Sequence, residues 1–586
     1  MGLDQNVLKA PNHYSTWLSL GLTLFPMLAY SIYLWTNTAN LPYADDIPAI
    51  LKAITDYLSG RNSLLEVLFR RHNEHPILLA RLMAITQVLL IGEVNFKTLA
   101  LIGSCSLIGI AFLLWRVSGI NRSQLIYFAP VCFILFQAQL VSASIWTMVV
   151  WSNIMVIFTA FLSLWWLTLP GKRFIWLAAT LLFATVFING NGLLLIPAGL
   201  VVLYLSRSGT EHWVLWSLVS MIALFFYSQT GEPISFPQLS LTFFIATLIN
   251  WMAFIGAYFS LVAHTMDYIS IGMGFLIGGV LLSYVILAFA LRARPSLSYN
   301  WMNPNPVLCG IITFVLLTAL SVALLRNEGF DVTQMLYGRY RQYSVTATCL
   351  GYLVILSFIK TRYATLGWLF PVVLIFTAFW NMAAYIRYER FVSFYSRDLQ
   401  ASMYSMFYND VALLHTPWYD RNNFTPFFKE AVRKGYYSPP LSKFPTPRQI
   451  LKAIGTQEDG PVSINEKRLT GEENLFGCHK KLILDNYGYD HPQPTSTGDF
   501  GKELYLAFYQ KDIVHLVAAS TVTPLFQKNE NVNWQAQLPL CRLRPGSYRV
   551  SSLSIDHGRI RAHRIPYELI IPQHATLEKL ENPQIR

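Results

Sequence analysis

The chain has 586 residues, of which 54% are hydrophobic, 15% aromatic and only 13% charged, and its mean hydropathy is positive. Soluble domains carry about 25% charged residues, so the composition excludes an ordinary soluble protein and indicates one solvated mostly by lipid. The net charge of +12 comes from basic residues scattered in short loops. No basic stripe or reader motif accompanies them, which argues against a nucleic-acid partner.

A helix needs about 20 apolar residues to cross the hydrocarbon core of a membrane. The first apolar run has one nearby lysine, Lys9, and no small-residue cleavage site, which predicts an uncleaved signal-anchor. If the N-terminus is cytoplasmic, the basic loops fall on the cytoplasmic side, as the positive-inside rule requires. Eleven spans are expected, at 16–36, 97–115, 124–141, 149–169, 174–188, 192–206, 213–228, 268–291, 306–325, 344–360 and 364–386.

Two further apolar segments would put basic loops on the wrong side if either were counted as a span. The segment 76–92 is short and carries Arg81, and we expect an interfacial helix in the outer leaflet. For 241–262 we expect a re-entrant or outer-leaflet hairpin, which a membrane tolerates only beside protein or a cavity.

The composition changes sharply after 386, which predicts a membrane domain at 1–386 and an outer-side domain at 387–586. The first outer loop, 37–96, belongs to the membrane domain in this scheme. The outer-side domain is expected to be helical at 387–460 and β-rich at 500–575, an α/β arrangement. Its strand candidates combine β-branched and aromatic residues with turn breakers: "ELYLAFYQ", "DIVHLVAAS", "GSYRVSSLSI" and "RIPYELII". Cys478 and Cys541 could pair there in an oxidising compartment.

The first chemical candidate is the pair Asp45 and Asp46, in "YADDIPAI" just after the first expected span. A solvated helix cap is the ordinary explanation, because "DDIPAI" resembles a first helical turn with proline just inside it. Two adjacent like charges ahead of an amphipathic stretch favour a functional role instead. Both interpretations stay open at this point.

The second candidate is "RRHNEHP", later in the same loop. Two histidines three apart with a glutamate between them could ligate a metal, but no third protein ligand is identifiable. Alternatively, the arginines and histidines bind a phosphate at the membrane surface, while the glutamate pairs with one of them. The residues are Arg70, Arg71, His72, Asn73, Glu74 and His75.

The third candidate is the outer loop 326–344, in which Arg339 and Arg341 flank Tyr340. An arginine–tyrosine belt at the interface is the ordinary explanation. Arginines are nevertheless disfavoured in short outer loops, so those gathered here need an anionic partner on that side. They are Arg326, Arg339, Arg341 and, near the tail, Arg387.

Together, these features predict transfer of a sugar from a lipid-linked phosphosugar. Arginines would hold the phosphate and stabilise its charge as it leaves. An aspartate would take the proton from an acceptor hydroxyl, so that its oxygen attacks the anomeric carbon. Direct displacement with one base inverts the anomeric configuration. No Walker loop or serine–histidine elbow offers a competing mechanism.

This order of features resembles the GT-C superfamily, integral membrane glycosyltransferases that use polyprenyl-phosphate sugars on the periplasmic or lumenal side. The resemblance covers 1–390: the acidic motif "YADD" follows the first span, and "HPILLARLMAITQVLLIGEVNFKTLALIG" leads into the second. It implies a GT-C-like polytopic α-helical fold and a general base at Asp46 or Asp45, with a slight preference for Asp46.

The segments "HNEHP", "FINGNGLLLIPAGL" and "GRYRQYS" also resemble, in the same order, the "HNEHR", "anGL" and "SRY" motifs of a bacterial O-antigen-modification-like subset. Pro76 stands where arginine is usual, and Gly338 where serine is. Metal-using relatives draw a second acid from the next outer loop, but "VSASIWT" (141–147) has none, which predicts metal-independent catalysis without a cofactor. The expected donor phosphate and lipid contacts are Arg339, Arg341, Tyr340, Arg70, Arg71 and His72, and the expected substrate contacts are His75, Glu74 and Asn73.

The expected partners are a polyprenyl-phosphate sugar donor, the lipid bilayer and a glycan, lipid or protein acceptor. The expected location is a bacterial inner membrane, with the C-terminal domain in the periplasm. A lipid-linked glycan transporter or flippase is one alternative, although few charged residues fall mid-span. An O-antigen polymerase or ligase is another, although its key loop would come later in the chain.

Overall fold

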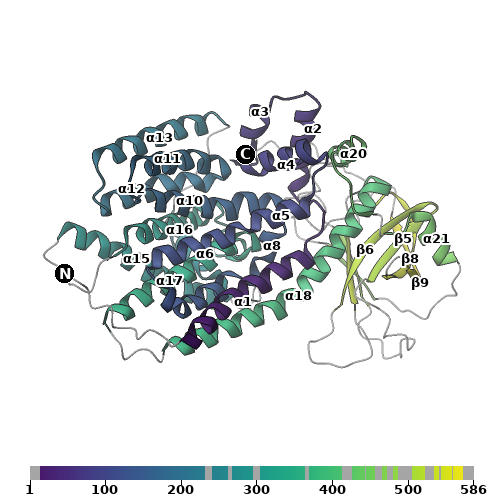
Figure 1. Ribbon diagram of the computed structural model, residues 1–586. Helices are drawn as coiled ribbons and strands as arrows, with labels where there is room; N and C mark the ends of the chain where they lie inside the picture. The colour runs from purple at the N-terminus through teal and green to yellow at the C-terminus, as the bar shows by residue number, and fades with distance from the viewer. Residues whose placement is uncertain are drawn as a thin grey trace. The chain divides into compact units, whose positions relative to one another are not determined.

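The fold is mostly helical, with a β-sheet near the C-terminus, as seen in a computed structural model of the chain (Figure 1). It divides into two compact units. The helical unit comprises Met1–Thr38, Ser59–Thr86 and Lys97–Glu389, and the sheet unit comprises Ala39–Leu58, Gln87–Phe96 and Arg390–Arg586. The structure describes residues 13–230, 240–261, 267–294, 304–362, 369–411, 425–441, 444–455, 465–470, 480–485, 504–521, 534–539, 543–556 and 559–571.

The helical unit is built from α-helices interrupted by short 3₁₀ and π turns. Helices α4 (Leu78–Ile91) and α18 (Leu369–Asn409) contribute to both units, as does α5 (Phe96–Ser104) through its first residue, Phe96. The other elements are α1 (His13–Asn37), α3 (Leu64–Phe69), β1 (Arg71–His72), β2 (His75–Pro76), α6 (Ser106–Ser118), η2 (Arg122–Phe128), α7 (Ala129–Leu135), η3 (Ala138–Leu140), α8 (Val141–Ser144), α9 (Thr147–Val149), η4 (Val150–Ile154), α10 (Met155–Trp166), α11 (Lys172–Ile188), η5 (Gly190–Leu194), α12 (Leu195–Leu205), α13 (Thr210–Ser228), α14 (Leu241–Gly256), η6 (Ala257–Phe259), α15 (Asp267–Ala293), α16 (Pro306–Leu325), η8 (Thr333–Leu336), η9 (Gly338–Tyr340) and α17 (Arg341–Arg362).

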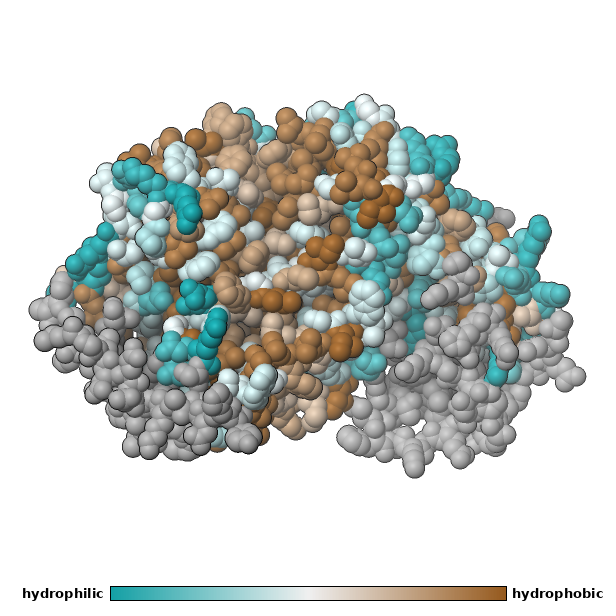
Figure 2. All heavy atoms as spheres, in the orientation of Figure 1, coloured by the Kyte–Doolittle hydropathy of each residue, from teal (hydrophilic) through white to brown (hydrophobic). Residues whose placement is uncertain are grey.

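Among the described residues, seven helices are long and apolar enough to cross a membrane, or up to eight if a bent pair counts as one span. Figure 2 shows the corresponding brown surface over the helices of this unit. The fold therefore fits a protein embedded in a membrane by several helices. Helices also occupy the remaining expected spans, but α11, α12, α13 and α17 are not among the seven. Eleven crossings stay a prediction.

The structure corrects the interpretation of 241–262 as a hairpin. Helix α14 runs without a turn through η6 to Phe259, and these 19 residues are long and apolar enough to cross a membrane. The positive-inside rule does not predict this helix correctly, because the side assigned to each loop depends on how many of the shorter helices before it cross the membrane. Helix α4, at 14 residues, is too short to span, as expected for 76–92.

The bent pair lies instead at 124–144, where one straight span was expected. Its two halves, Gln124–Leu135 and Ala138–Ser144, meet at 42°, because Gln137 is extended between them. A break in an apolar environment leaves backbone carbonyls without partners. Asn381 of α18 satisfies two of them, since its Nδ2 donates to the carbonyls of Phe133 at 2.7 Å and Phe136 at 2.8 Å.

The sheet unit contains a seven-stranded antiparallel sheet of order β3-β4-β7-β6-β5-β8-β9. The four expected strands fall within β5, β6, β8 and β9, whereas β3, β4 and β7 were not expected. Cys478 and Cys541 lie outside the described residues. The elements are η1 (Ile47–Leu51), α2 (Lys52–Leu58), α20 (Thr425–Arg433), α21 (Pro447–Gly455), β3 (Asn465–Thr470), β4 (Lys480–Asp485), β5 (Leu504–Gln510), β6 (Ile513–Thr521), β7 (Trp534–Pro539), β8 (Gly546–Asp556) and β9 (Arg559–Ile571).

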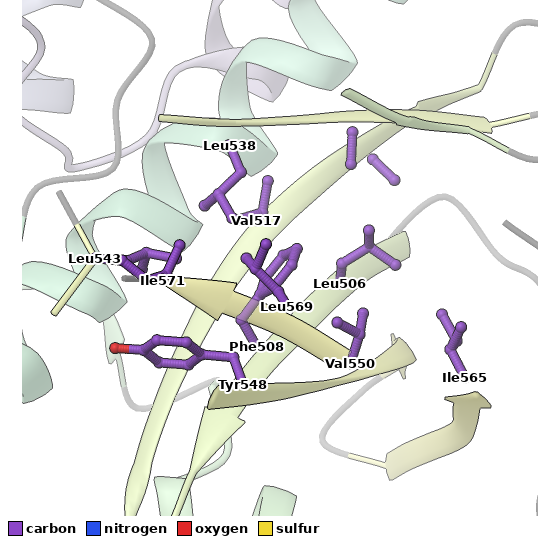
Figure 3. Packing of buried hydrophobic residues seen from close by; sticks show 12 residues of the cluster. Leu506, Phe508, Val517, Leu538, Leu543, Tyr548, Val550, Ile565, Leu569 and Ile571 are labelled. Atoms are coloured by element: carbon purple, nitrogen blue, oxygen red, sulfur yellow. The ribbon is translucent and has the colours of Figure 1, made fainter. Parts of the chain in front are cut away.

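One face of the sheet carries the apolar core shown in Figure 3. Alternate residues of neighbouring strands supply it, because side chains of a strand point to opposite faces with a period of two. The end of α18 is tied to the same sheet, since the Nδ2 of Asn409 donates to the carbonyl of Val514 at 2.7 Å. Labelled core residues include Leu506, Phe508, Val517, Tyr548, Val550 and Leu569.

The core also buries a titratable side chain, His515 of β6. Its ring lies 5.9 Å from that of Tyr548. Burial, together with the charge of Arg544, lowers the pKa of His515 to about 4. Below the ordinary pKa of 6.5 the unfolded chain therefore binds a proton that the folded sheet excludes.

The sheet should lose stability as the pH falls from about 6.5 towards 4, because stability rises with pH wherever the unfolded state binds more protons. A shift from 6.5 to about 4 corresponds to roughly 3 kcal/mol at the acid end. Hydrogen exchange of the β5 and β6 amides in the full chain, corrected for the intrinsic rate, measures this slope. His515→Gln should flatten it.

The matched control is His563→Gln, which removes a half-buried histidine of β9 in the same sheet. It is expected to keep the acid slope. An equal loss of slope in both variants would contradict the assignment to His515.

Candidate functional site

The segment "RRHNEHP" forms a tight β-hairpin in the helical unit. Strands β1 and β2 pair antiparallel, so that His72 lies opposite His75 and Arg71 opposite Pro76. Asn73 supports the turn in the left-handed region, with φ of 54°, which asparagine tolerates better than most residues. The hairpin thus places both histidines on neighbouring strand positions.

Glu74 and His75 are held in a partly exposed charged group. Glu74 Oε2 lies 2.7 Å from Arg326 Nη2 and 3.7 Å from His75 Nε2. On its other side, His75 Nδ1 lies 3.4 Å from the hydroxyl of Tyr227. Burial lowers the pKa of His75; the charge of Glu74 opposes the shift, whereas Arg326 and Arg71 add to it. His75 is therefore neutral near pH 7.

The first two arginines of the hairpin region are engaged by the protein itself. Arg71 Nε donates to Thr230 Oγ1 at 2.9 Å, and its guanidinium stacks over the Tyr227 ring at 5.1 Å. Arg70 ends α3, and its carbonyl accepts a hydrogen bond from the buried Arg81. These contacts position the hairpin, whatever else the two arginines bind.

The segment Asn189–Gly190–Asn191 links the hairpin to the arginine loop. Gly190 packs so closely on His75 that an added Cβ would collide with the imidazole Nδ1. Asn189 Nδ2 donates to Asn153 Oδ1, and Asn191 Nδ2 donates to the Tyr343 hydroxyl at 2.6 Å. Three sequence motifs more than 100 residues apart therefore meet in one unit.

The arginine loop is attached to the same group through its backbone. The carbonyl of Arg339 accepts from Asn153 Nδ2 at 3.2 Å and from Gln342 Nε2 at 2.6 Å. We call Asn153, Asn189, Asn191 and Gln342 the amide cluster. Asn153 lies in the π turn η4, and such turns occur frequently at functional sites.

Arg339 and its neighbours border the amide cluster. The guanidinium of Arg339 lies over the ring of Tyr340 at 5.0 Å, and that ring is 5.7 Å from Phe254. A Cβ at Gly338 would collide with Ser142 Oγ. A side chain larger than that of glycine therefore has no room at this position unless Ser142 moves.

Arg341 is buried, only 4% exposed, and has no acidic partner among the described residues. All of its hydrogen bonds there are made by Nη1: to Gln139 Oε1, to the carbonyl of Ser260 at 2.6 Å and to that of Ala257 at 3.3 Å. Gln139 and the fully buried Gln137 come from the bent pair. We call Arg341, Gln137 and Gln139 the buried arginine site.

No negative charge balances this site within the described part of the helical unit. The guanidinium lies 5.9 Å from the Tyr388 ring, and Arg387 acts on it as a like charge. Gln137 Nε2 is a buried donor that has no partner among the described residues. A buried cation without a counter-charge is costly, so the site is chemically suited to an anion.

The acidic pair lies in the sheet unit, in a tight and strained turn. Asp46 Oδ2 accepts from the backbone N–H of Tyr43 at 3.0 Å, and the Asp46 N–H donates back to the Tyr43 carbonyl at 2.8 Å. Ala44 between them has φ of 44°, which costs a non-glycine residue roughly 1–2 kcal/mol. The π turn η1 begins directly after Asp46.

The two aspartates differ in their surroundings. Asp46 is fully buried and Asp45 is 7% exposed. The charges of Asp46 and Glu93 reinforce the effect of burial, which raises the pKa of Tyr437 well above its ordinary value. Tyr437 therefore stays protonated and donates to the Asn40 carbonyl at 2.9 Å. Asp46 is the more enclosed member of the pair, and Asp45 is the one closer to solvent.

The described residues include no group of three His, Cys, Asp or Glu side chains that could hold a metal ion. The hairpin and the arginine loop, expected as separate candidates, lie together in the helical unit. The acidic pair belongs to the other unit, so its convergence with them stays a prediction. Sequence analysis missed Gln137, Gln139, Ser142, Asn153 and Gln342, although amides inside apolar runs such as "LFQAQL" signal function in membranes.

Gly190→Ala should destabilise the helical unit by about 1–3 kcal/mol, as overpacking does, because the new Cβ collides with His75. Combining it with His75→Ala should remove most of this cost, since the colliding ring is then absent. Thermal unfolding of both variants and of the double variant in nanodiscs measures this coupling.

Gly279→Ala is the control, because nothing lies within 4 Å of a Cβ there and alanine is the better residue inside a helix. We expect no loss of stability from it. Equal costs for Gly190→Ala with and without His75 would contradict the packing assigned here.

Comparison of the chain with family models, with curated proteins and with solved structures finds no match. The functional argument therefore starts from the geometry of the buried arginine site, the amide cluster and the acidic turn.

Proposed function

We propose that the protein is a membrane glycosyltransferase of GT-C type, which transfers a sugar from a polyprenyl-phosphate donor to an acceptor. The observation that carries this proposal is the buried, acid-free Arg341. A cation in an apolar, membrane-embedded unit needs an anionic partner, and the phosphate of a lipid-linked sugar brings one at membrane depth.

The buried arginine site suits a phosphate in particular. Nη1 of Arg341 is occupied by neutral oxygens, which leaves Nε and Nη2 for bidentate contact with two phosphate oxygens. The second positive charge, on Arg387, and Gln137 Nε2, a donor without a partner in the described part of the chain, add to the site's affinity for an anion. As the phosphate leaves the anomeric carbon, these groups stabilise its growing charge.

The acidic turn supplies the base in this proposal. We assign the base to Asp45, because it is 7% exposed whereas Asp46 is fully buried. The carboxylate of Asp45 takes the acceptor hydroxyl's proton while that oxygen bonds to the anomeric carbon and the C–O bond to phosphate breaks. The anomeric configuration inverts. The backbone strain at Ala44 supports a functional turn.

A transporter of lipid-linked glycans is the second candidate. The bent pair at 124–144 favours it, because broken helices commonly line the substrate sites of transporters. Such a protein would move the donor across the bilayer without releasing sugar. Liposomes that contain the protein and a labelled polyprenyl-phosphate sugar distinguish the two functions.

Asp45→Asn should lower the rate of sugar release about 10²- to 10⁴-fold, the usual contribution of a general base, and leave donor binding intact. Arg341→Gln should weaken binding of the donor phosphate itself. The measurement is sugar loss from polyprenyl-phosphate donors carrying a panel of hexoses and pentoses, in membranes that contain the variant.

Glu211→Gln is the control, since it removes an exposed carboxylate on α13 that pairs with Lys172. It should change neither rate nor binding. Full sugar release by Asp45→Asn would refute the proposed base, and unchanged donor binding in Arg341→Gln would refute the phosphate site.

A further inference from the structure

Four polar atoms around the arginine loop are buried without a hydrogen-bond partner among the described residues. A native protein carries few such atoms, and each one calls for an explanation. They are Ser142 Oγ, Asn191 Oδ1, Arg339 Nε and Gln342 Oε1.

These atoms belong to one connected group. The Arg339 carbonyl holds the amides of Gln342 and Asn153. Tyr343 links Asn153 to Asn191, because its hydroxyl donates to the Asn153 carbonyl at 3.4 Å and accepts from Asn191 Nδ2. Ser142 Oγ lies against Gly338, next to Arg339. Two of the four atoms, Asn191 Oδ1 and Gln342 Oε1, therefore belong to the amide cluster, and the other two belong to residues joined to it through Arg339 and Gly338.

The chemistry of the four atoms differs from that of the buried arginine site. Two are amide oxygens, which only accept, one is a guanidinium N–H, which only donates, and one is a hydroxyl, which does both. An anion without a proton cannot donate a hydrogen bond to the two amide oxygens. A ligand with several hydroxyl groups matches the mixture, because each hydroxyl both donates and accepts.

Aromatic rings complete the surroundings. The ring of Phe254 lies 5.7 Å from Tyr340 and 5.9 Å from Tyr343. Such rings offer apolar faces beside polar groups. A sugar likewise combines apolar C–H faces with hydroxyl groups. No carboxylate belongs to this described group, so it offers no ion-pair partner to a cationic ligand.

We propose that the amide cluster, with Ser142 and Arg339, binds the hydroxyl groups of the donor's sugar, while Arg341 holds the phosphate. The inference rests on the proposed function, because it assumes that sugar and phosphate arrive on one lipid. Gln342 and Asn191 each hold one internal side-chain bond through the amide nitrogen. The amide oxygens of Gln342 and Asn191 therefore remain available to accept a hydrogen bond from a sugar hydroxyl.

Ser142→Ala is the sharpest test, because Ser142 Oγ makes no hydrogen bond that the substitution would break among the described residues. The full chain in nanodiscs is titrated with undecaprenyl phosphate and with undecaprenyl phosphate carrying each of a panel of hexoses and pentoses. The ratio of the two dissociation constants gives the selectivity for the sugar. We expect wild type to prefer at least one sugar-bearing lipid.

Ser142→Ala and Asn191→Ala should each reduce this selectivity about three- to tenfold, the effect of one neutral hydrogen bond, with the affinity for bare undecaprenyl phosphate unchanged. Ser163→Ala is the matched control, since it removes a hydroxyl of α10 that donates to the Ala178 carbonyl. It should change neither affinity.

The inference is overturned if wild type prefers no member of the panel, if Ser142→Ala keeps full selectivity, or if Asn191→Ala weakens both lipids equally. Full selectivity in Ser142→Ala would mean that ordered water alone satisfies these atoms. If the variants lose selectivity but the wild type releases no sugar, the sugar site is supported and glycosyl transfer is refuted. If the wild type releases sugar but shows no selectivity, glycosyl transfer is supported and the sugar site is refuted.

Discussion

The cost of burying Arg341 away from water is the constraint around which much of the helical unit is arranged. A guanidinium in a low-dielectric interior must have oxygen acceptors around it. The described structure supplies these as neutral groups, Gln139 and the carbonyls of Ala257 and Ser260. Neutral acceptors stabilise the cation without cancelling its charge, so the attraction for an anion is preserved.

The bend at Gln137 follows from that requirement. A straight α-helix through 124–144 would distribute its glutamines around the axis, whereas the break lets Gln139 reach Arg341 and lets Gln137 reach Gln139. The freed carbonyls at Phe133 and Phe136 then need donors, and Asn381 provides them. A single polar residue on α18 thus stabilises an irregular backbone inside an apolar bundle.

Much of this architecture follows from local sequence. Apolar runs locate the helices, and alternating β-branched residues locate β5, β6, β8 and β9. The bend leaves no turn signal in the sequence, because 136–138 contains neither glycine nor proline. The path of α14 was misjudged because loop charges depend on how many helices cross. The links of Asn191 to Tyr343 and of Asn153 to Arg339 join residues 152 and 186 positions apart, which no local pattern encodes.

The two proposed sites, one around Arg341 and one around Arg339, are kept apart by the backbone of the "GRYR" segment. Arg339 and Arg341 are two positions apart, where the 3₁₀ turn η9 passes into α17. Residues two apart on a helix do not face the same side. The Arg339 guanidinium therefore lies over Tyr340, and that of Arg341 lies beside Gln139 of the bent pair. Under the proposed function, Arg341 holds the phosphate and Arg339 the sugar, so that one short segment contacts both parts of the donor.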